Sequence, residues 1–127
     1  MPRDYPRTLR LGEQIRRELA QLIDRELKDP RIGMVTINDV VVSADLAHAK
    51  VYYTVLGDAV AREQTREGLE KASGFLRGRL GKILHTRVTP ELHFIYDETE
   101  ERGRRLDDLI ARARAEDAAR HGGEGEA

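Results

Sequence analysis

The chain has 127 residues, of which 39% are hydrophobic, 35% are charged and none is cysteine, and its formal net charge is −1. This length and balance predict one domain with its own core, and the cysteine count excludes disulfides and thiolate metal sites. The sequence has no apolar run long enough to cross a membrane and no hydrophobic signal segment at its start. We therefore expect a cytoplasmic protein without a membrane partner.

The near-neutral total conceals an uneven distribution of charge along the chain. Residues 1–96 contain 16 basic and 13 acidic side chains, a net charge of +3, whereas residues 97–127 contain 6 and 10, a net charge of −4. A basic body with an acidic tail is typical of a protein with a polyanionic partner, and chance scatter of charges is the alternative explanation.

The first predicted element is a helix that starts at Thr8, its N-cap, and ends near Lys28, before Pro30. Residues 1–7, which precede it, are expected to be flexible. Its apolar residues recur at spacings of three and four and therefore share one face. They are Ile15, Leu19, Leu22, Ile23 and Leu27.

Two strands are predicted next, over residues 33–43 and 48–56. The apolar phase of the first strand changes near Asn38 and Asp39, which indicates a bulge there. The second strand alternates cleanly, and the short turn between the two favours an antiparallel hairpin. The residues expected to share one face of the second strand are Ala49, Val51, Tyr53 and Val55.

The second half of the chain is expected to begin with two helices, about residues 59–72 and 74–85, separated by a break at Ala72-Ser73-Gly74. Asp58 is the predicted N-cap of the first of them. A third strand over residues 91–97 should point Leu92, Phe94 and Tyr96 to one side.

The last elements are a C-terminal helix over residues 99–118 and a disordered acidic tail over residues 119–127. The order α-β-β-α-α-β, followed by this last helix, predicts an α+β domain over residues 8–98. Its three-stranded sheet should have helices packed on one face.

The segment from Lys71 to Arg87 contains five basic residues, no acidic residue, and three glycines. On a helical wheel the leucines of this segment face the sheet, and the glycines fall on the opposite, cationic side. A helix that began after Ser73 would add free amide donors, so this surface is suited to a close approach by phosphate. The alternative is that the glycines are tolerated by chance on a solvated surface.

The predicted RNA-binding residues comprise this segment and two arginines at the N-terminus. They are Lys71, Ser73, Gly74, Arg77, Gly78, Arg79, Gly81, Lys82, Arg87, Arg7 and Arg10. For Arg7 and Arg10, as for Arg3, Arg16 and Arg17, an ordinary solvated helix face is the competing interpretation.

Catalytic interpretations find little support in this sequence. The four histidines lack a familiar metal-binding spacing, His93 is expected to point outward from its strand, and no serine lies in a nucleophile motif. We therefore predict no catalytic residue, no metal site, no cofactor and no enzymatic activity.

Several short motifs, taken in order, resemble those of the ribosome-binding factor A family over about residues 7–112. Each motif is weak alone, whereas their order and spacing together are specific. The motifs are Lys28-Asp29-Pro30-Arg31, Val35-Thr36-Ile37, Val42-Ser43, Asp45-Leu46, Ala49-Lys50-Val51, Ala72-Ser73-Gly74, Leu76-Arg77 and Thr89-Pro90-Glu91-Leu92.

The resemblance implies a type II KH-like fold, in which an Ala-x-Gly kink, here Ala72-Ser73-Gly74, replaces the Gly-x-x-Gly clamp of standard KH domains. It also implies a bacterial assembly factor that binds free small (30S) ribosomal subunits and the 5′ region of 16S rRNA. Such a factor would assist late maturation, including 5′-end processing, and growth in the cold. We expect it to act as a monomer.

The resemblance and the residues together favour recognition of RNA by shape and charge. Phosphate contacts would dominate affinity, and with only 5% aromatic residues base stacking should contribute little. The alternative is a protein–protein docking module whose basic face is incidental.

Overall fold

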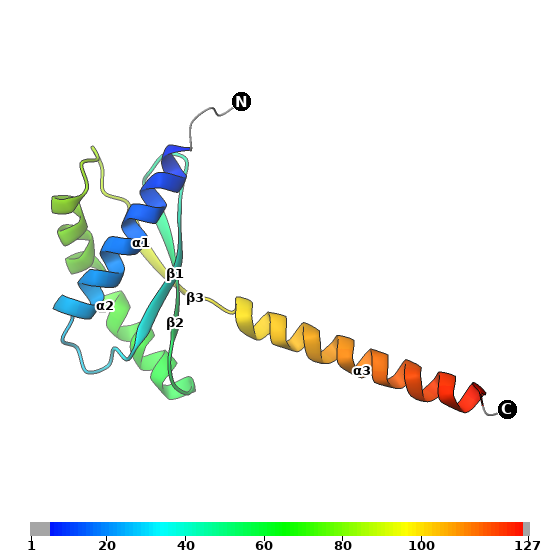
Figure 1. Ribbon diagram of the computed structural model, residues 1–127. Coiled ribbons are helices and arrows are strands. Elements are labelled where there is room, and N and C mark those ends of the chain that lie inside the picture. Colours follow the sequence, from blue (N-terminus) through cyan, green and yellow to red (C-terminus); the bar gives the residue numbers. More distant parts are fainter. Residues whose placement is uncertain (1–5, 126–127) are drawn as a thin grey trace. The chain divides into compact units, whose positions relative to one another are not determined.

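The computed structural model describes residues 6–125, with side chains described through Arg120. Its elements follow in the order α1 (Arg7–Glu26), β1 (Val35–Val42), β2 (His48–Val55), α2 (Ala59–Ile83), β3 (Glu91–Tyr96) and α3 (Thr99–Gly125). The α+β class and the single three-stranded sheet are confirmed (Figure 1). No helix within residues 6–125 is both long and apolar enough to span a membrane.

The sheet has the order β1-β2-β3, with β2 in the centre. β1 and β2 form the predicted antiparallel hairpin, and their register shifts between Ile37 and Asp39, which confirms the predicted bulge. β3 pairs with β2 in parallel. Parallel neighbours need a long crossover, and α2 supplies it.

Helices α1 and α2 cover the same face of the sheet, as predicted (Figure 1). The core between these layers contains the predicted apolar faces of α1, β2 and α2. Its fully buried side chains include Ile15, Leu19, Val51, Tyr53, Leu69, Leu76 and Leu80. Edge-on contacts of the Tyr53 ring with Phe94 and Tyr96 extend this core to β3.

Helix α1 begins at Arg7, so the prediction of Thr8 as its N-cap is wrong. Pro6 occupies the cap position, and its carbonyl accepts hydrogen bonds from the amides of Leu9 and Arg10. The chain is therefore already helical at Thr8. The predicted flexible segment, residues 1–7, lies mostly outside the described residues.

Helix α2 is one continuous helix, whereas two helices with a break at Ala72-Ser73-Gly74 were predicted. Buried Leu69 and Leu76 lie on either side of this point, and their packing outweighs the low helix propensity of serine and glycine. The Ser73 hydroxyl donates to the carbonyl of Glu70 at 2.9 Å, a bond formed within the helix. The predicted N-cap of α2 is confirmed, because Asp58 accepts from the amide of Ala61 at 2.9 Å.

Helix α3 belongs to a second unit, residues 98–127. It continues to Gly125, so the predicted end at Ala118 is too early and residues 119–125 are helical rather than disordered. Ala115, Ala118 and Ala119 are strong helix formers and extend the helix into the glycine-rich end.

Candidate nucleic-acid interface

The outer side of α2 carries a continuous stripe of exposed residues that face away from the core. Each of them lies three or four residues from another member of the set, so they share one helical face. We call them the α2 stripe: Lys71, Gly74, Phe75, Gly78 and Lys82, all of which are exposed. The wheel prediction that the glycines lie on the exposed, cationic side is confirmed, because Gly74, Gly78 and Gly81 are all exposed.

The three glycines of the segment differ in their surroundings. A Cβ atom added at Gly74 or Gly78 would meet nothing within 4 Å, whereas one added at Gly81 would lie 3.0 Å from Thr89 Oγ1. Gly81 therefore allows a close approach between α2 and the following loop. Gly74 and Gly78 have no such neighbour among the described residues, and they leave the helix backbone open to a ligand.

The continuity of α2 removes one part of the predicted site. The amides after Ser73 lie inside a helix and not at its start, so they are not the free donors that were expected. Ser73 itself is only half-exposed and donates within the helix. The attraction for phosphate at this surface therefore depends on side-chain charge and on access to the backbone.

Two of the predicted arginines already have partners within the protein. Arg79 forms an ion pair with Glu26 at 2.7 Å, which links α2 to α1. Arg77 donates from Nε and Nη2 to the carbonyl of Thr89, at 3.1 and 2.8 Å, and so holds the loop after α2. Because both contribute to packing or loop geometry, they are poorer candidates for RNA contacts than the two lysines of the α2 stripe.

Lys71 and Lys82 are exposed, and no ion pair is formed with either of them by the side chains of residues 6–120. Lys71 is close enough to Asp29 to contribute to the lowered pKa of that carboxyl group. An exposed ammonium without a fixed partner can exchange its hydration and counterions for a phosphate at small cost.

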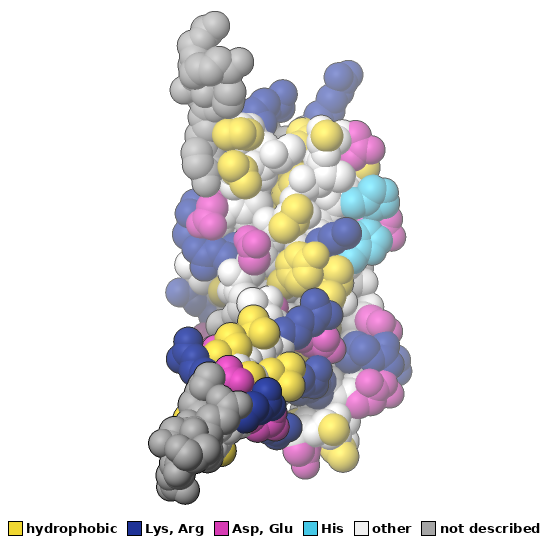
Figure 2. Space-filling model, turned by 90° about the vertical axis from the view of Figure 1, so that its right-hand side faces the viewer, with side chains coloured by type: hydrophobic (Ala, Val, Ile, Leu, Met, Phe, Trp, Pro, Cys, Tyr) yellow, Lys and Arg dark blue, Asp and Glu magenta, His cyan; other side chains and the backbone are white. Residues whose placement is uncertain are grey.

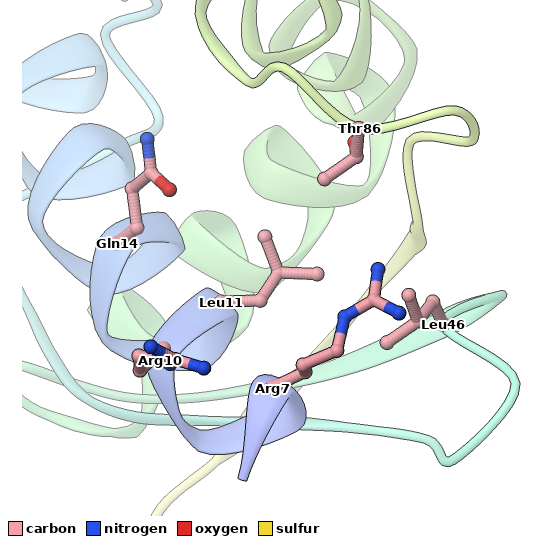
Figure 3. Close-up of a pocket in the computed structure, with 6 residues that line it drawn as sticks. All are labelled: Arg7, Arg10, Leu11, Gln14, Leu46 and Thr86. Atoms are coloured by element: carbon pink, nitrogen blue, oxygen red, sulfur yellow. The ribbon is translucent and has the colours of Figure 1, made fainter. Parts of the chain in front are cut away.

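The predicted arginines at the N-terminus lie at a second place, where α1 begins. Arg7 and Arg10 line a pocket of about 240 Å³ together with Leu11, Gln14, Leu46 and Thr86 (Figure 3). Figure 3 shows the guanidinium of Arg7 pointing toward Leu46 and Thr86. Arg87 is exposed in the same loop as Thr86, so the fold brings the loop that carries it close to the first turn of α1.

Arg16 and Arg17, further along α1, are less available than Arg7 and Arg10. Arg16 pairs with Glu13 at 3.0 Å, and Arg17 lies 4.0 Å from the same carboxylate. Both are ordinary helix-surface pairs, which favours the solvated-face interpretation for them. Arg3 lies outside the described residues.

Phe75 is the residue of this surface that the sequence reasoning missed. Its side chain is 48% exposed and lies one turn from Lys71 and from Gly78. An exposed phenyl ring one turn from a lysine can stack on an unpaired base, a contact worth about 1–3 kcal/mol. The signal was present in the sequence, because position 75 lies outside the leucine face of the same wheel.

Comparisons with known proteins identify the family of this chain. The sequence model of the ribosome-binding factor A family matches residues 7–110. A ribosome-binding factor A from Thioalkalivibrio sulfidiphilus is 59% identical over 121 residues, covering 95% of this chain and 94% of that one.

Solved structures give the same result. An NMR structure of a Thermotoga maritima protein, a putative ribosome binding factor A by its description, is 33% identical, with a TM-score of 0.65, and the match covers 75% of this chain and 91% of that one. A Thermus thermophilus ribosome binding factor A homology model, fitted into a cryo-EM map of a 30S complex, is 28% identical with a TM-score of 0.58, covering 68% and 91%. This chain therefore belongs to the ribosome-binding factor A family, a non-catalytic family of ribosome-binding factors.

Proposed function

We propose that this protein binds the free small (30S) ribosomal subunit through 16S rRNA and assists late maturation of the subunit. The observation that carries the proposal is the α2 stripe, in which open glycine backbone lies between two exposed lysines. The family to which this chain belongs, and the relative that was fitted into a map of a 30S complex, support the small subunit as the target. The proposed place of action is the cytoplasm.

The mechanism we propose is selective binding without covalent chemistry. The factor would bind one conformation of immature rRNA better than another and would thereby shift the population toward it. Through this shift it would assist processing at the 5′ end of 16S rRNA and growth in the cold. We propose that the factor acts as a monomer, because one chain supplies every residue of the α2 stripe.

The α2 stripe suits a folded RNA surface better than a single-strand clamp. Its glycines lie within helix α2 and not in a loop, so it lacks the flexible Gly-x-x-Gly loop of a KH clamp. The two lysines would contact phosphates, and Phe75 would contact one exposed base. Docking onto a ribosomal protein is the competing function, because an exposed phenyl ring also suits a protein partner.

The test is co-sedimentation of Lys71→Glu with Lys82→Glu on free small subunits. We expect binding to weaken about tenfold or more, because two phosphate contacts become repulsive. Both side chains are exposed, so circular dichroism should match that of the wild type. The loss of Lys71 near Asp29 should lower the urea midpoint only slightly.

The matched control is Arg104→Glu with Arg112→Glu on α3, which changes the net charge by the same amount. Binding by this control should fall much less. Equal losses for the two double variants, or no loss for the α2 variant, would show that the α2 stripe is not the binding surface. Binding to mature subunits and to intact ribosomes, measured alongside, should be weaker than binding to free immature subunits.

A further inference from the structure

We propose that His48, Glu91 and His93 form a binding site for a divalent transition-metal ion, with Zn²⁺ as the representative probe. The three residues lie on the sheet face that is turned away from α1 and α2. Figure 2 shows this face, with histidine side chains gathered at one side of it. The site is separate from the α2 stripe, and the proposal does not depend on the proposed function.

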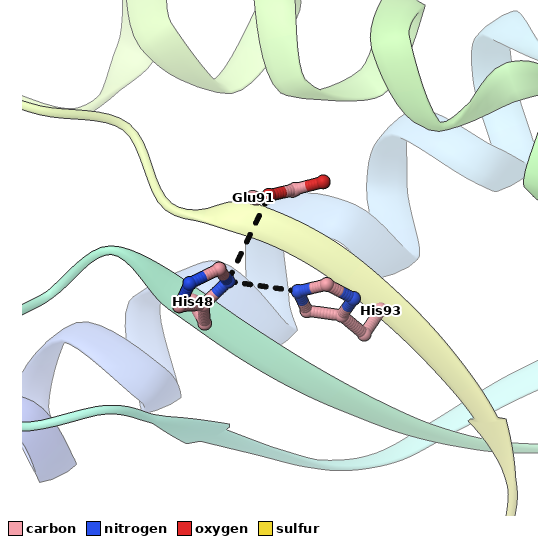
Figure 4. A group of neighbouring side chains, drawn as sticks. All are labelled: His48, Glu91 and His93. Atoms are coloured by element: carbon pink, nitrogen blue, oxygen red, sulfur yellow. Dashed lines mark hydrogen bonds and ion pairs between the residues drawn. The ribbon is translucent and has the colours of Figure 1, made fainter.

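The sheet register brings these three side chains together. In the parallel pair β2–β3, His48 lies opposite Glu91, and His93 follows Glu91 by two residues on the same face (Figure 4). Alternation along each strand points all three outward, opposite to buried Ala49 and Leu92. The histidines are 45 residues apart in sequence, so no spacing motif reveals the site.

The distances between the potential ligand atoms suit a metal ion. His48 Nδ1 lies 2.9 Å from His93 Nε2 and 3.7 Å from Glu91 Oε2, and all three ligand atoms lie within 4.8 Å of one another. Zinc bonds of about 2.0–2.2 Å at tetrahedral angles place ligand atoms about 3.3 Å apart. Small side-chain rotations would therefore bring the three atoms into a coordination shell.

The tautomers open to the two imidazole rings also allow both of them to bind a metal ion. The present His48–His93 contact needs one ring nitrogen to donate and the other to accept. A metal ion requires a lone pair on both nitrogens, and a neutral imidazole supplies it when its proton moves to the opposite ring nitrogen. No net proton is lost from neutral rings, and no oxidant or reductant is involved.

The donor set selects the class of ion. Two imidazoles and one carboxylate suit Zn²⁺, Ni²⁺ or Cu²⁺, whereas Mg²⁺ prefers oxygen ligands and retains water. All three side chains are exposed, so solvent would complete the coordination shell. Lys50 on β2 lies opposite His93 on β3. Its ammonium group would repel a bound metal ion and should keep the affinity of the site for that ion modest.

The experiment is a calorimetric titration of the full, untagged chain with ZnCl₂, with MgCl₂ titrated as the comparison ion. We expect saturable binding of one Zn²⁺ per chain and no binding of Mg²⁺. His48→Gln and His93→Gln should each weaken Zn²⁺ binding about tenfold or more, and Glu91→Gln should weaken it less. His85→Gln, an exposed histidine outside the cluster, is the matched control and should bind Zn²⁺ like the wild type.

A second measurement reports the ligands directly. The EPR spectrum of the Cu²⁺-loaded chain should show coupling to two imidazole nitrogens, reduced to one in either histidine variant. The proposal is overturned if the wild type does not bind Zn²⁺ saturably. It is also overturned if His85→Gln weakens binding as much as the cluster variants do, since this would show adventitious binding to surface histidines.

Discussion

Asp29 fixes the turn that follows α1 through several bonds to Arg31. Its Oδ1 accepts from the amide of Arg31 at 2.9 Å, and its carboxylate also accepts from the guanidinium. The side-chain bond from Arg31 is the main reason that the pKa of Asp29 falls to about 2, and the backbone bond and nearby Lys71 also contribute. The ionised carboxylate therefore stabilises the folded chain.

This coupling predicts a pH-dependent effect of Asp29→Asn. The pKa of the carboxyl is about 2 in the folded chain against an ordinary value of 3.8, so its stabilisation is present above about pH 4 and is lost toward about pH 2. The variant should therefore unfold at lower urea than the wild type at about pH 6, by a small margin because the pair is partly exposed. The difference in midpoint should shrink as the pH falls through about 3.

Urea midpoints measured across this pH range provide the check, with Asp24→Asn as the control. Asp24 is an exposed carboxylate near the end of α1. A midpoint difference for Asp29→Asn that stays constant down to about pH 2 would contradict the role given to the Asp29–Arg31 bonds.

At the scale of elements, α2 combines a buried leucine face with an outer face on which Gly74 and Gly78 contact no other part of the described protein. Gly78→Ala should stabilise the folded protein by up to about 1 kcal/mol, because its Cβ would meet nothing and alanine favours the helix. The same methyl group should weaken small-subunit binding, because it separates the helix backbone from the RNA. Urea unfolding and co-sedimentation measure the two effects separately.

Gly81→Ala is the comparison on the same helix. Its Cβ would lie 3.0 Å from Thr89 Oγ1, so the neighbouring loop would have to shift and the gain in stability should be smaller. If Gly78→Ala stabilises the protein and leaves binding unchanged, the glycine face of α2 is a tolerated surface and not a contact surface.

Patterns within short stretches of the sequence predicted the features that depend only on neighbouring residues. The change in apolar phase near Asn38 predicted the bulge of β1, Asp58 predicted the start of α2, and the leucine spacing predicted which side of α2 is buried. The break at Ala72-Ser73-Gly74 was wrong because tertiary packing of the leucines outweighed local propensity.

The missed features depend on residues that are distant in the sequence. The Glu26–Arg79 ion pair, the Arg77–Thr89 bonds and the His48–His93 contact all form between separate elements. The parallel pairing of β2 with β3 likewise arises only when α2 has crossed the sheet. Charge and glycine content thus located the candidate surface, and only the fold showed which of its cations are available.

At the scale of the whole molecule, the chain divides into residues 1–97 and residues 98–127. Every residue of the hydrophobic core cluster, and each partly buried residue packed on it, lies between Leu11 and Tyr96. The apolar stripe of α3, formed by Leu106, Leu109 and Ile110, has no second element in its own unit to pack against within the described residues.

A chain that ends after Asp97 should therefore fold on its own. We expect a cooperative urea transition with a midpoint close to that of the full chain, because the core is retained. Circular dichroism at increasing urea is sufficient to measure it. Loss of the cooperative transition would show that α3 contributes to the stability of the core.

The central claim is that phosphate contacts from the α2 stripe hold the protein on the small subunit, and salt dependence tests it most directly. Affinity for free small subunits should fall linearly with salt on logarithmic axes. The slope of log affinity against log salt concentration should be smaller in magnitude for Lys71→Glu with Lys82→Glu than for the wild type. The expected difference is about two, or about one for each lost phosphate contact. A wild-type affinity that does not change with salt, or the same slope in wild type and variant, would contradict the claim and favour docking on a protein.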